Sequence, residues 1–241
     1  MEKRTMLYEG KAKRIYETSE ENILFIEYKD DATAFNGEKK DVLTGKGVFN
    51  NEISSLLFSK LHSLGVQSHF VKRLSANEQL VKKVEIIPIE VVVRNIAAGS
   101  LLKRLGVERG QTFEKPIVEF YLKDDDLGDP LINIDHIHAL KLATKEEVDK
   151  MRDVAIHVND LLIDLFKEVD IQLVDFKLEF GRDTKGSVLL ADEISPDTCR
   201  LWDIHTGESF DKDLFRFQLG SLQEGYETIL QRLGGDITCT K

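Results

Sequence analysis

The segment Ile171-Gln172-Leu173-Val174-Asp175-Phe176-Lys177-Leu178-Glu179-Phe180 alternates apolar residues with polar and charged ones along most of its length. Neighbouring side chains of a strand point to opposite faces, so this pattern predicts a strand with one apolar face and with Asp175, Lys177 and Glu179 together on the other. A second apolar run over residues 187–194 follows and predicts a β-hairpin. A half-exposed strand also carries a polar face without any function, and the segment alone leaves that alternative open.

The second strand of this hairpin ends in an apolar run that is interrupted by Asp192-Glu193. A carboxylate among apolar residues is costly unless it is paired or bound to a cation, and two facing carboxylates repel unless a divalent ion lies between them. A turn centred on Lys185-Gly186 pairs Glu179 with Asp192, whereas a turn centred on Asp183-Thr184 pairs Asp175 with Asp192. Glycine at the later turn position favours the first register. We therefore expect Glu179 and Asp192 to face each other and to hold a metal ion.

The composition limits the classes of function. The chain has 241 residues and a formal net charge of −10, which argues against general binding to nucleic acid or to anionic membranes. The sequence contains no apolar run long enough to span a membrane, and Cys199 and Cys239 have no ligand-like spacing. No apolar segment follows the basic residues at the start, so we expect no signal peptide. We expect a cytoplasmic protein with two reduced thiols, in which any anionic ligand is bound by a local concentration of lysine and arginine.

The order of elements predicts an α+β fold with antiparallel sheets. Strands are expected over residues 6–9, 11–17, 23–28, 69–74, 79–84, 85–95, 171–180 and 187–194. Helices are expected over residues 47–64, from a capping box at Thr144-Lys145-Glu146-Glu147 to about residue 169, and over 212–233. We place a boundary near residue 85, between an N-terminal antiparallel lobe (1–85) and a C-terminal α+β lobe (86–241), with a ligand cleft between them.

Basic residues gather at two places. Gly10-Lys11-Ala12-Lys13 combines a glycine, which permits close approach of a ligand to the backbone, with two lysines on one face, an arrangement that suits a polyphosphate. Lysines on a solvated edge strand are the alternative. Arg94 ends an apolar strand, and Gly99-Ser100 then opens a short helix that ends at Gly106. Arg94, Ser100 and Arg200 could bind a phosphate monoester, but a simple helix cap and structural arginines explain them equally well.

Four stretches together resemble the SAICAR synthetases, the phosphoribosylaminoimidazole-succinocarboxamide synthases of purine biosynthesis, in their short bacterial form. They are residues 7–13, 93–101, 173–181, and 191–197 continuing through Arg200-Leu201-Trp202-Asp203. The resemblance implies a two-lobed, ATP-grasp-like fold with the nucleotide between the lobes. It also implies an ATP-dependent ligase that joins carboxyaminoimidazole ribonucleotide (CAIR) to L-aspartate, releases ADP and phosphate, and forms homo-oligomers.

The resemblance also implies roles for single residues. The nucleotide would be bound by Gly10, Lys11, Ala12, Lys13, Lys82 and Lys123, with Glu179 and Asp192 holding its Mg²⁺ ion. The ribonucleotide would be bound by Arg94, Ser100, Asp129, Asp197 and Arg200. Asp175 and Lys177 would lie where the substrates react, and Glu90, with Asp129, would contact a second metal ion near the CAIR carboxylate.

Two other functions share part of this pattern. A small-molecule kinase would use the same lysines and carboxylates, but it would not need Arg94, Ser100 and Arg200 as a second phosphate site. A non-catalytic nucleotide-binding module would not need three charged residues on one face of the strand that carries Glu179.

Overall fold

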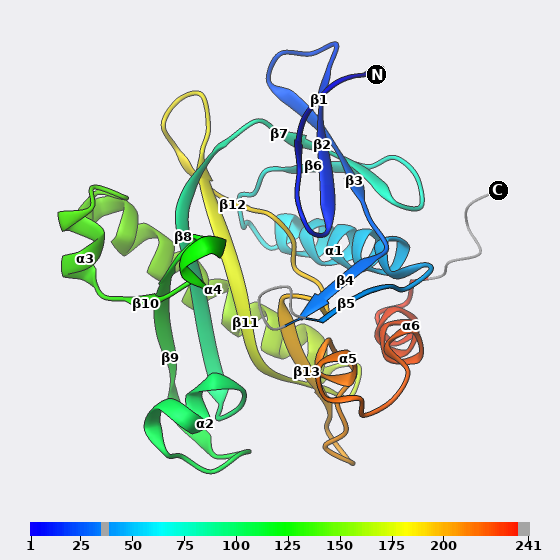
Figure 1. Ribbon diagram of the computed structural model, residues 1–241, viewed down its shortest axis with the longest axis vertical. Helices are drawn as coiled ribbons and strands as arrows, with labels where there is room; N and C mark the ends of the chain where they lie inside the picture. The colour runs from blue at the N-terminus through cyan, green and yellow to red at the C-terminus, as the bar shows by residue number, and fades with distance from the viewer. Residues whose placement is uncertain (35–38, 236–241) are drawn as a thin grey trace.

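The computed structural model describes residues 1–34 and 39–235, which form an α+β structure with antiparallel sheets (Figure 1). The first sheet has the strand order β1-β2-β3-β7-β6. Its strands are β1 (Lys3–Glu9), β2 (Lys13–Thr18), β3 (Ile23–Tyr28), β7 (Glu78–Lys82) and β6 (Phe70–Arg73). A short ribbon of β4 (Asp31–Ala34) and β5 (Lys39–Val42) follows β3 in the chain. All strand pairs in the first sheet are antiparallel, as the sequence predicts.

The second sheet has the order β10-β9-β8-β11-β12, with β13 also paired to β11. Its strands are β8 (Glu85–Ile96), β9 (Thr112–Leu122), β10 (Leu131–Ile132), β11 (Ile171–Arg182), β12 (Val188–Ala191) and β13 (Cys199–Asp203). The two long strands β8 and β11 lie side by side in its centre (Figure 1). Their β-branched and aromatic residues suit a buried, pleated surface, and Val91, Val93 and Leu178 are fully buried.

Helices α1 (Lys46–Ser63) and α4 (Lys145–Lys167) pack on these sheets. The other helices are α2 (Ser100–Leu105), the 3₁₀ turn η1 (Asp125–Leu127), α3 (Ile134–Ala139), α5 (Asp213–Phe217) and α6 (Leu222–Arg232). The capping box predicted for α4 is present, because the Thr144 hydroxyl accepts from the Glu147 N–H and the Glu147 carboxylate accepts from the Thr144 N–H. One large apolar core joins α1, α4, α6 and the second sheet.

The hairpin of β11 and β12 is confirmed, but its predicted register is wrong by one residue. Glu179 lies opposite Ala191, and Arg182 lies opposite Val188. The connection is a three-residue loop over 184–186, in which Gly186 has a φ of 80°. The Asp183 carboxylate accepts from the N–H of Lys185 in this loop and from that of Ser187 just after it, and so stabilises the turn. Strand β12 ends at Ala191, so Asp192 lies just beyond it, with a left-handed backbone φ of 59°.

Other predicted elements need smaller corrections. The helix predicted over 212–233 is two helices, because Gln218 adopts a left-handed φ of 55° and the chain turns before α6 begins at Leu222. The second strand begins at Lys13 instead of Lys11. Strands β4, β5, β9, β10 and β13 were not predicted. Pro116 interrupts the pattern of β9, and it is tolerated because β10 pairs only with Phe120 and Tyr121 near the end of that strand.

The chain passes from the first sheet to the second between Lys82, the end of β7, and Glu85, the start of β8. This change lies close to the predicted boundary at residue 85. The core residues of α1 nevertheless belong to the same apolar cluster as those of the second sheet. In the described part of the chain, no helix combines the length and the apolar character that a membrane crossing requires. Cys199 is a buried free thiol, whereas Cys239 lies outside the described residues.

Candidate active site

A cavity of about 810 Å³ is lined by residues from both sheets. Its apolar wall comes mainly from β2, β3, β7 and the start of β8, and includes Ile15, Leu24 and Val81. Charged residues from β2, β8 and β11 and from the segment after β12 make up most of the rest. All of the site residues predicted from sequence line this cavity except Ser100, which is exposed beside it. Residues separated by more than 150 positions in the chain thus share one cavity, of a size suited to a small-molecule ligand.

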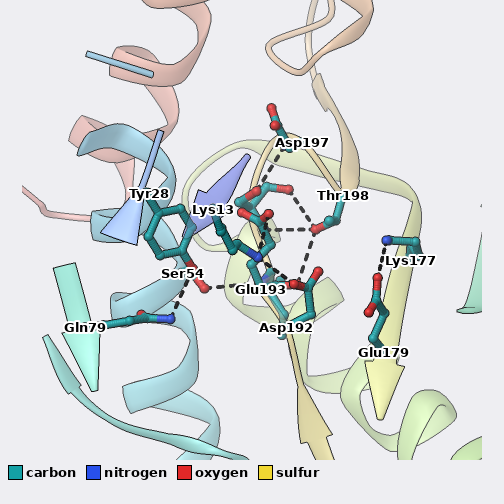
Figure 2. Close-up of polar contacts among 12 residues, drawn as sticks. Lys13, Tyr28, Ser54, Gln79, Lys177, Glu179, Asp192, Glu193, Asp197 and Thr198 are labelled. Carbon is teal, nitrogen blue, oxygen red and sulfur yellow. Dashed lines mark hydrogen bonds and ion pairs between the residues drawn. The ribbon is translucent and has the colours of Figure 1, made fainter. Parts of the chain in front are cut away.

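Lys13 forms the first charged cluster of the cavity (Figure 2). Its ammonium lies 2.6 Å from Asp192 Oδ1 and 2.9 Å from Glu193 Oε1, and the residue is only 9% exposed. Burial alone would lower the pKa of Lys13, but the two carboxylates raise it well above its usual value. The pKa of Asp192 is held far below its usual range against the effect of burial, chiefly by Lys13. Both groups are therefore charged at neutral pH.

Lys177 forms the second cluster. Its Nζ lies 2.6 Å from Glu179 Oε1, on the same face of β11, and 2.8 Å from Glu90 Oε1 on β8. Glu90 and Glu179 are directly opposite in the pairing of β8 with β11, so one lysine neutralises two facing carboxylates. Lys123 also reaches Glu179 Oε1 at 3.0 Å. Burial raises the pKa of Glu90 in spite of Lys177. The predicted charged face of β11 is thus real, and its charges are paired.

Asp175 lies between two arginines and defines the third cluster. Arg94 NH1 is 2.7 Å from Asp175 Oδ2, and Arg200 NH1 is 2.9 Å from the same oxygen. Arg94 is also fixed by Glu119, whose Oε2 lies 2.6 Å from Arg94 Nε, and Arg200 by Asp213 at 2.9 Å. The guanidinium groups are therefore held in place while part of each lines the cavity. The two guanidinium groups are planar cations with paired N–H donors, and their fixed arrangement suits a phosphate or carboxylate.

The turn before α2 brings two predicted residues to these arginines. Ser100 Oγ lies 3.5 Å from Arg94 NH2. The cap of α2 is Gly99 and not Ser100, so the interpretation of Ser100 as a capping serine is wrong. Gly99 has a φ of 58°, and a Cβ at this position would lie 2.6 Å from Arg200 NH2. The glycine is needed both for its backbone conformation and for the close approach of Arg200.

The remaining predicted residues differ in their surroundings. Gly10 and Ala12 line the cavity beside Lys11, which is more exposed than Lys13 and pairs with Asp125 at 2.6 Å. Asp129 has a φ of 48° and accepts from the Asp124 N–H. Lys82 lines the cavity, but its backbone N–H already donates to the His69 carbonyl at 2.6 Å. A ligand cannot use that N–H without breaking this bond.

Asp197 is bound on both carboxylate oxygens by other residues of the chain. Lys46 Nζ lies 2.5 Å from Oδ2, and the Tyr226 hydroxyl donates to Oδ1. Lys212 Nζ is a further 3.7 Å neighbour of Oδ2. The Lys46 side chain is only 1% exposed, so this pair lies in the interior. The contacts of Asp197 are those of an anchor between α1, α6 and the segment after β12.

The carboxylates of the cavity fit a hard divalent cation in type but not as a ready-made cage. Oxygen atoms of carboxylates are the ligands that Mg²⁺ prefers, usually one or two together with substrate phosphates. Among residues 1–34 and 39–235, no three His, Cys, Asp or Glu side chains are grouped as a metal site. Glu193 Oε2 is buried without a hydrogen-bond partner beside Asp192. The donor set therefore fits an ion that is shared with a bound polyphosphate.

Comparisons with known proteins decide the family. The SAICAR synthetase family model matches residues 6–233. The chain belongs to the SAICAR synthetase family. A phosphoribosylaminoimidazole-succinocarboxamide synthase from Anoxybacillus flavithermus is 64% identical over the whole of both chains. The synthase from Ehrlichia chaffeensis has a crystal structure with a TM-score of 0.94 at 46% identity, covering 96% of this chain and 99% of that one.

A second solved structure is described as a SAICAR synthetase in complex with ADP. It has a TM-score of 0.92 at 47% identity and covers 95% of this chain and 97% of that one. Family membership confirms the resemblance drawn from the four sequence stretches, and with it a ligase of purine biosynthesis. The mixed α/β fold with antiparallel sheets matches these structures.

Several residues of this SAICAR synthetase site were not predicted. Glu193, Lys212 and Arg216 line the cavity, and Asp213 and Glu119 hold the arginines. The run Asp211-Lys212-Asp213 was a visible signal, because alternating charges next to an apolar segment need partners. His69 had no such signal, since its neighbours in sequence predict only a strand.

Proposed function

We propose that the protein joins CAIR to L-aspartate with cleavage of ATP to ADP and phosphate, and that the cavity between the two sheets is the site. The observation that carries the proposal is the presence of two separate sets of cationic groups in one cavity. Lys13 and Lys177 lie among carboxylates at one set, and Arg94 and Arg200 flank Asp175 at the other. A polyphosphate and a phosphate monoester can therefore be bound together.

ATP would occupy the part of the cavity next to the first sheet. The apolar side chains of Ile15, Leu24 and Val81 offer a surface for adenine, and Val84 and Ile86 line the cavity after the two sheets meet. The Lys82 and Lys83 N–H groups already donate to the His69 and Asn22 carbonyls, so hydrogen bonds to adenine from this segment would come from other backbone groups around Lys82. The glycine turn with Lys11 and Lys13 would bind the phosphates, and Lys123 would contribute charge beside Glu179.

Glu179 and Asp192 would hold Mg²⁺ together with the phosphates of the nucleotide. When bound, the ion supplies neutralisation of phosphate charge and polarises the phosphoryl group. Glu90 and Asp129 would contact a second ion near the CAIR carboxylate. Both lie in the same cavity, and Glu90 is the cross-strand neighbour of Glu179.

The ribonucleotide phosphate would bind Arg94, Ser100 and Arg200. This places the imidazole carboxylate toward Asp175 and Lys177, between the two phosphate sites. A CAIR carboxylate oxygen would attack the γ-phosphorus of ATP, ADP would leave, and an acyl phosphate would form. The amine of aspartate would then attack the acyl carbon, with loss of a proton and expulsion of phosphate. The side chains position the reactants and neutralise charge, which accounts for most of catalysis in phosphoryl transfer.

The proposed architecture is a two-lobed, ATP-grasp-like enzyme with a boundary near residue 85. The change of sheet between Lys82 and Glu85 supports this boundary. The predicted homo-oligomer stays a prediction.

The decisive experiment measures ADP release with CAIR and L-aspartate added singly and together. We expect sustained release only with both substrates, and SAICAR formed in equal amount. Release that ignores aspartate would instead identify a small-molecule kinase, and binding without release would identify a nucleotide-binding module. Glu179→Gln and Asp192→Asn should each lower kcat about a hundredfold or more, with circular dichroism unchanged. Normal turnover in either variant would remove that residue from the metal site.

A further inference from the structure

His69 connects the first sheet to the segment that carries Asp192. The residue lies immediately before β6, is only 3% exposed, and packs edge-on against Phe58 with ring centroids 5.7 Å apart. Its backbone N–H donates to the Leu190 carbonyl at 2.8 Å, and its ring Nε2 lies 3.0 Å from the Asp192 carbonyl oxygen. A carbonyl oxygen can only accept, so Nε2 is the protonated nitrogen of the imidazole.

The hydrogen bonds from the His69 N–H and from its ring follow one another along the same pair of segments. Residues 67–69 run parallel to β12, because Ser68 bridges Leu190 and the Leu190 N–H donates to the Gln67 carbonyl at 3.3 Å. Strand β12 ends at Ala191, so there is no regular partner for the next carbonyl, that of Asp192. The imidazole of His69 supplies this missing donor. The ladder is thus extended by a side chain to the residue where the backbone changes direction.

Asp192 needs such support because its φ of 59° is unfavourable for a residue with a Cβ. The left-handed conformation is disfavoured for residues with a Cβ, although less for Asp than for most, and it persists only when surrounding contacts over-determine it. On the other side of the bend, the Ile194 N–H donates to Ser54 Oγ at 3.3 Å. The bend directs the Asp192 carboxylate to Lys13 at 2.6 Å. Figure 2 shows Lys13 between Asp192 and Glu193 at this point.

We propose that His69 is a positioning residue for the nucleotide's metal ion: its Nε2–H holds the peptide of Asp192 in the left-handed bend, which aims the carboxylate into the cavity. The His69 carbonyl also accepts from the Lys82 N–H at the apolar wall of the cavity. One residue therefore fixes the spacing between the proposed adenine wall and the metal-binding carboxylate. This inference rests on the proposed role of Asp192 at the metal site.

The test uses ADP binding by titration calorimetry on the full-length protein, with and without Mg²⁺, so that no turnover is needed. The ratio of the two dissociation constants is the enhancement of ADP affinity by Mg²⁺. His69→Leu removes the donor, and His69→Gln keeps an N–H donor at a similar reach. His62→Leu is the matched control, because His62 packs on the same aromatic cluster and bonds Ser68 Oγ at 2.6 Å without contacting Asp192. His69→Met replaces His69→Leu if the latter does not fold.

We expect His69→Leu to reduce the Mg²⁺ enhancement at least tenfold while ADP binding without Mg²⁺ changes less than threefold. His69→Gln and His62→Leu should retain the enhancement within threefold, even where the melting temperature falls. Equal losses in His69→Leu and His62→Leu, or an unchanged enhancement in His69→Leu, would overturn the inference and leave the proposed metal site standing. A loss in His69→Gln as large as that in His69→Leu would also overturn it. A wild-type protein without any Mg²⁺ enhancement would sink the proposed metal site itself.

Discussion

The buried pair of Lys46 and Asp197 gives the sharpest test of how the cavity is built. Asp197 was expected from the family resemblance to bind substrate, but its two oxygens are bound by Lys46 and Tyr226. Lys46 is the first residue of α1, and its Nζ lies 2.5 Å from Asp197 Oδ2. The Lys46 side chain is only 1% exposed. Asp197→Asn keeps the shape and the acceptor for Tyr226 but removes the charge. We expect the main effect to be a loss of folding stability.

The size of the effect follows from the burial. Removing one partner of a buried ion pair costs about 3–5 kcal/mol, because the other charge is left unpaired in the interior. Lys212 at 3.7 Å also loses its counter-charge, so Asp197→Asn should lie in this range. Lys46→Met should cost less, roughly 1–3 kcal/mol, because Lys212 still compensates Asp197. In the double variant no buried Lys46 charge is left unpaired, so its cost should fall at least about 1 kcal/mol below the sum of the single costs.

Urea unfolding of the four proteins measures this cycle, with equal m-values as the check that the unfolded states are comparable. For a chain of this length, a loss of 3 kcal/mol corresponds to a fall in melting temperature of roughly 6–12 °C. A cost below about 1 kcal/mol for Asp197→Asn, with additive single effects, would refute the anchoring role. A raised KM for one substrate at unchanged stability would then return Asp197 to substrate binding.

Three further variants test separate parts of the molecule. Gly99→Ala should displace Arg200, because a Cβ at this position would lie 2.6 Å from Arg200 NH2. The KM for CAIR should rise about tenfold or more, while the ADP affinity measured by calorimetry stays unchanged. Loss of ADP binding would contradict this expectation. Hydrogen bonds from the Thr206 N–H and from Arg232 lower the pKa of Asp203 to about 2. The ionised carboxylate therefore stabilises the folded state above the unfolded-state pKa near 3.9, and this contribution is lost as pH falls through about 2. The difference in urea midpoint between wild type and Asp203→Asn should accordingly shrink between pH 5 and pH 2, and a constant difference would count against the ion pair. Thr144→Ala removes the cap of α4 and should cost about 1 kcal/mol in urea unfolding without changing kcat, whereas no loss would mean that the cap contributes little.

The predictable part of this structure is the part that local patterns determine. Alternation along β11 and the capping box at Thr144 both depend on residues within a few positions of each other, and both are confirmed. The hairpin register was missed for a reason that is also local but less visible. The Asp183 carboxylate accepts from the Lys185 and Ser187 N–H groups and so favours a loop of three residues, which glycine placement alone does not reveal. In the observed register Glu179 lies opposite Ala191, the last residue of β12, and Asp192 follows it.

Contacts between distant segments could not be predicted in the same way. Lys46 and Asp197 are 151 positions apart, and each reads in sequence as an ordinary polar residue of a helix or a loop. His69 likewise contacts Asp192 across 123 positions. Their partners are chosen by the packing of α1 and the first sheet against the second sheet. The four family stretches identify the chemistry, whereas the residues that aim those groups become visible only in three dimensions.

The charges of the cavity bear on how an acidic protein can bind polyanions. The chain has 43 acidic and 33 basic side chains, yet nine basic and nine acidic side chains line the cavity, so the acidic excess lies outside it. Cations of the cavity already have carboxylate partners, such as Lys13 with Asp192 and Lys177 with Glu179. On the proposed function, Lys13 would exchange Asp192 for a phosphate of the nucleotide, and the Asp192 carboxylate would exchange the lysine for Mg²⁺. Such an exchange of partners leaves no buried charge unpaired at either end of the reaction, and an unpaired buried charge costs far more than a surface one. The carboxylates therefore keep the lysines charged and in position before the nucleotide arrives.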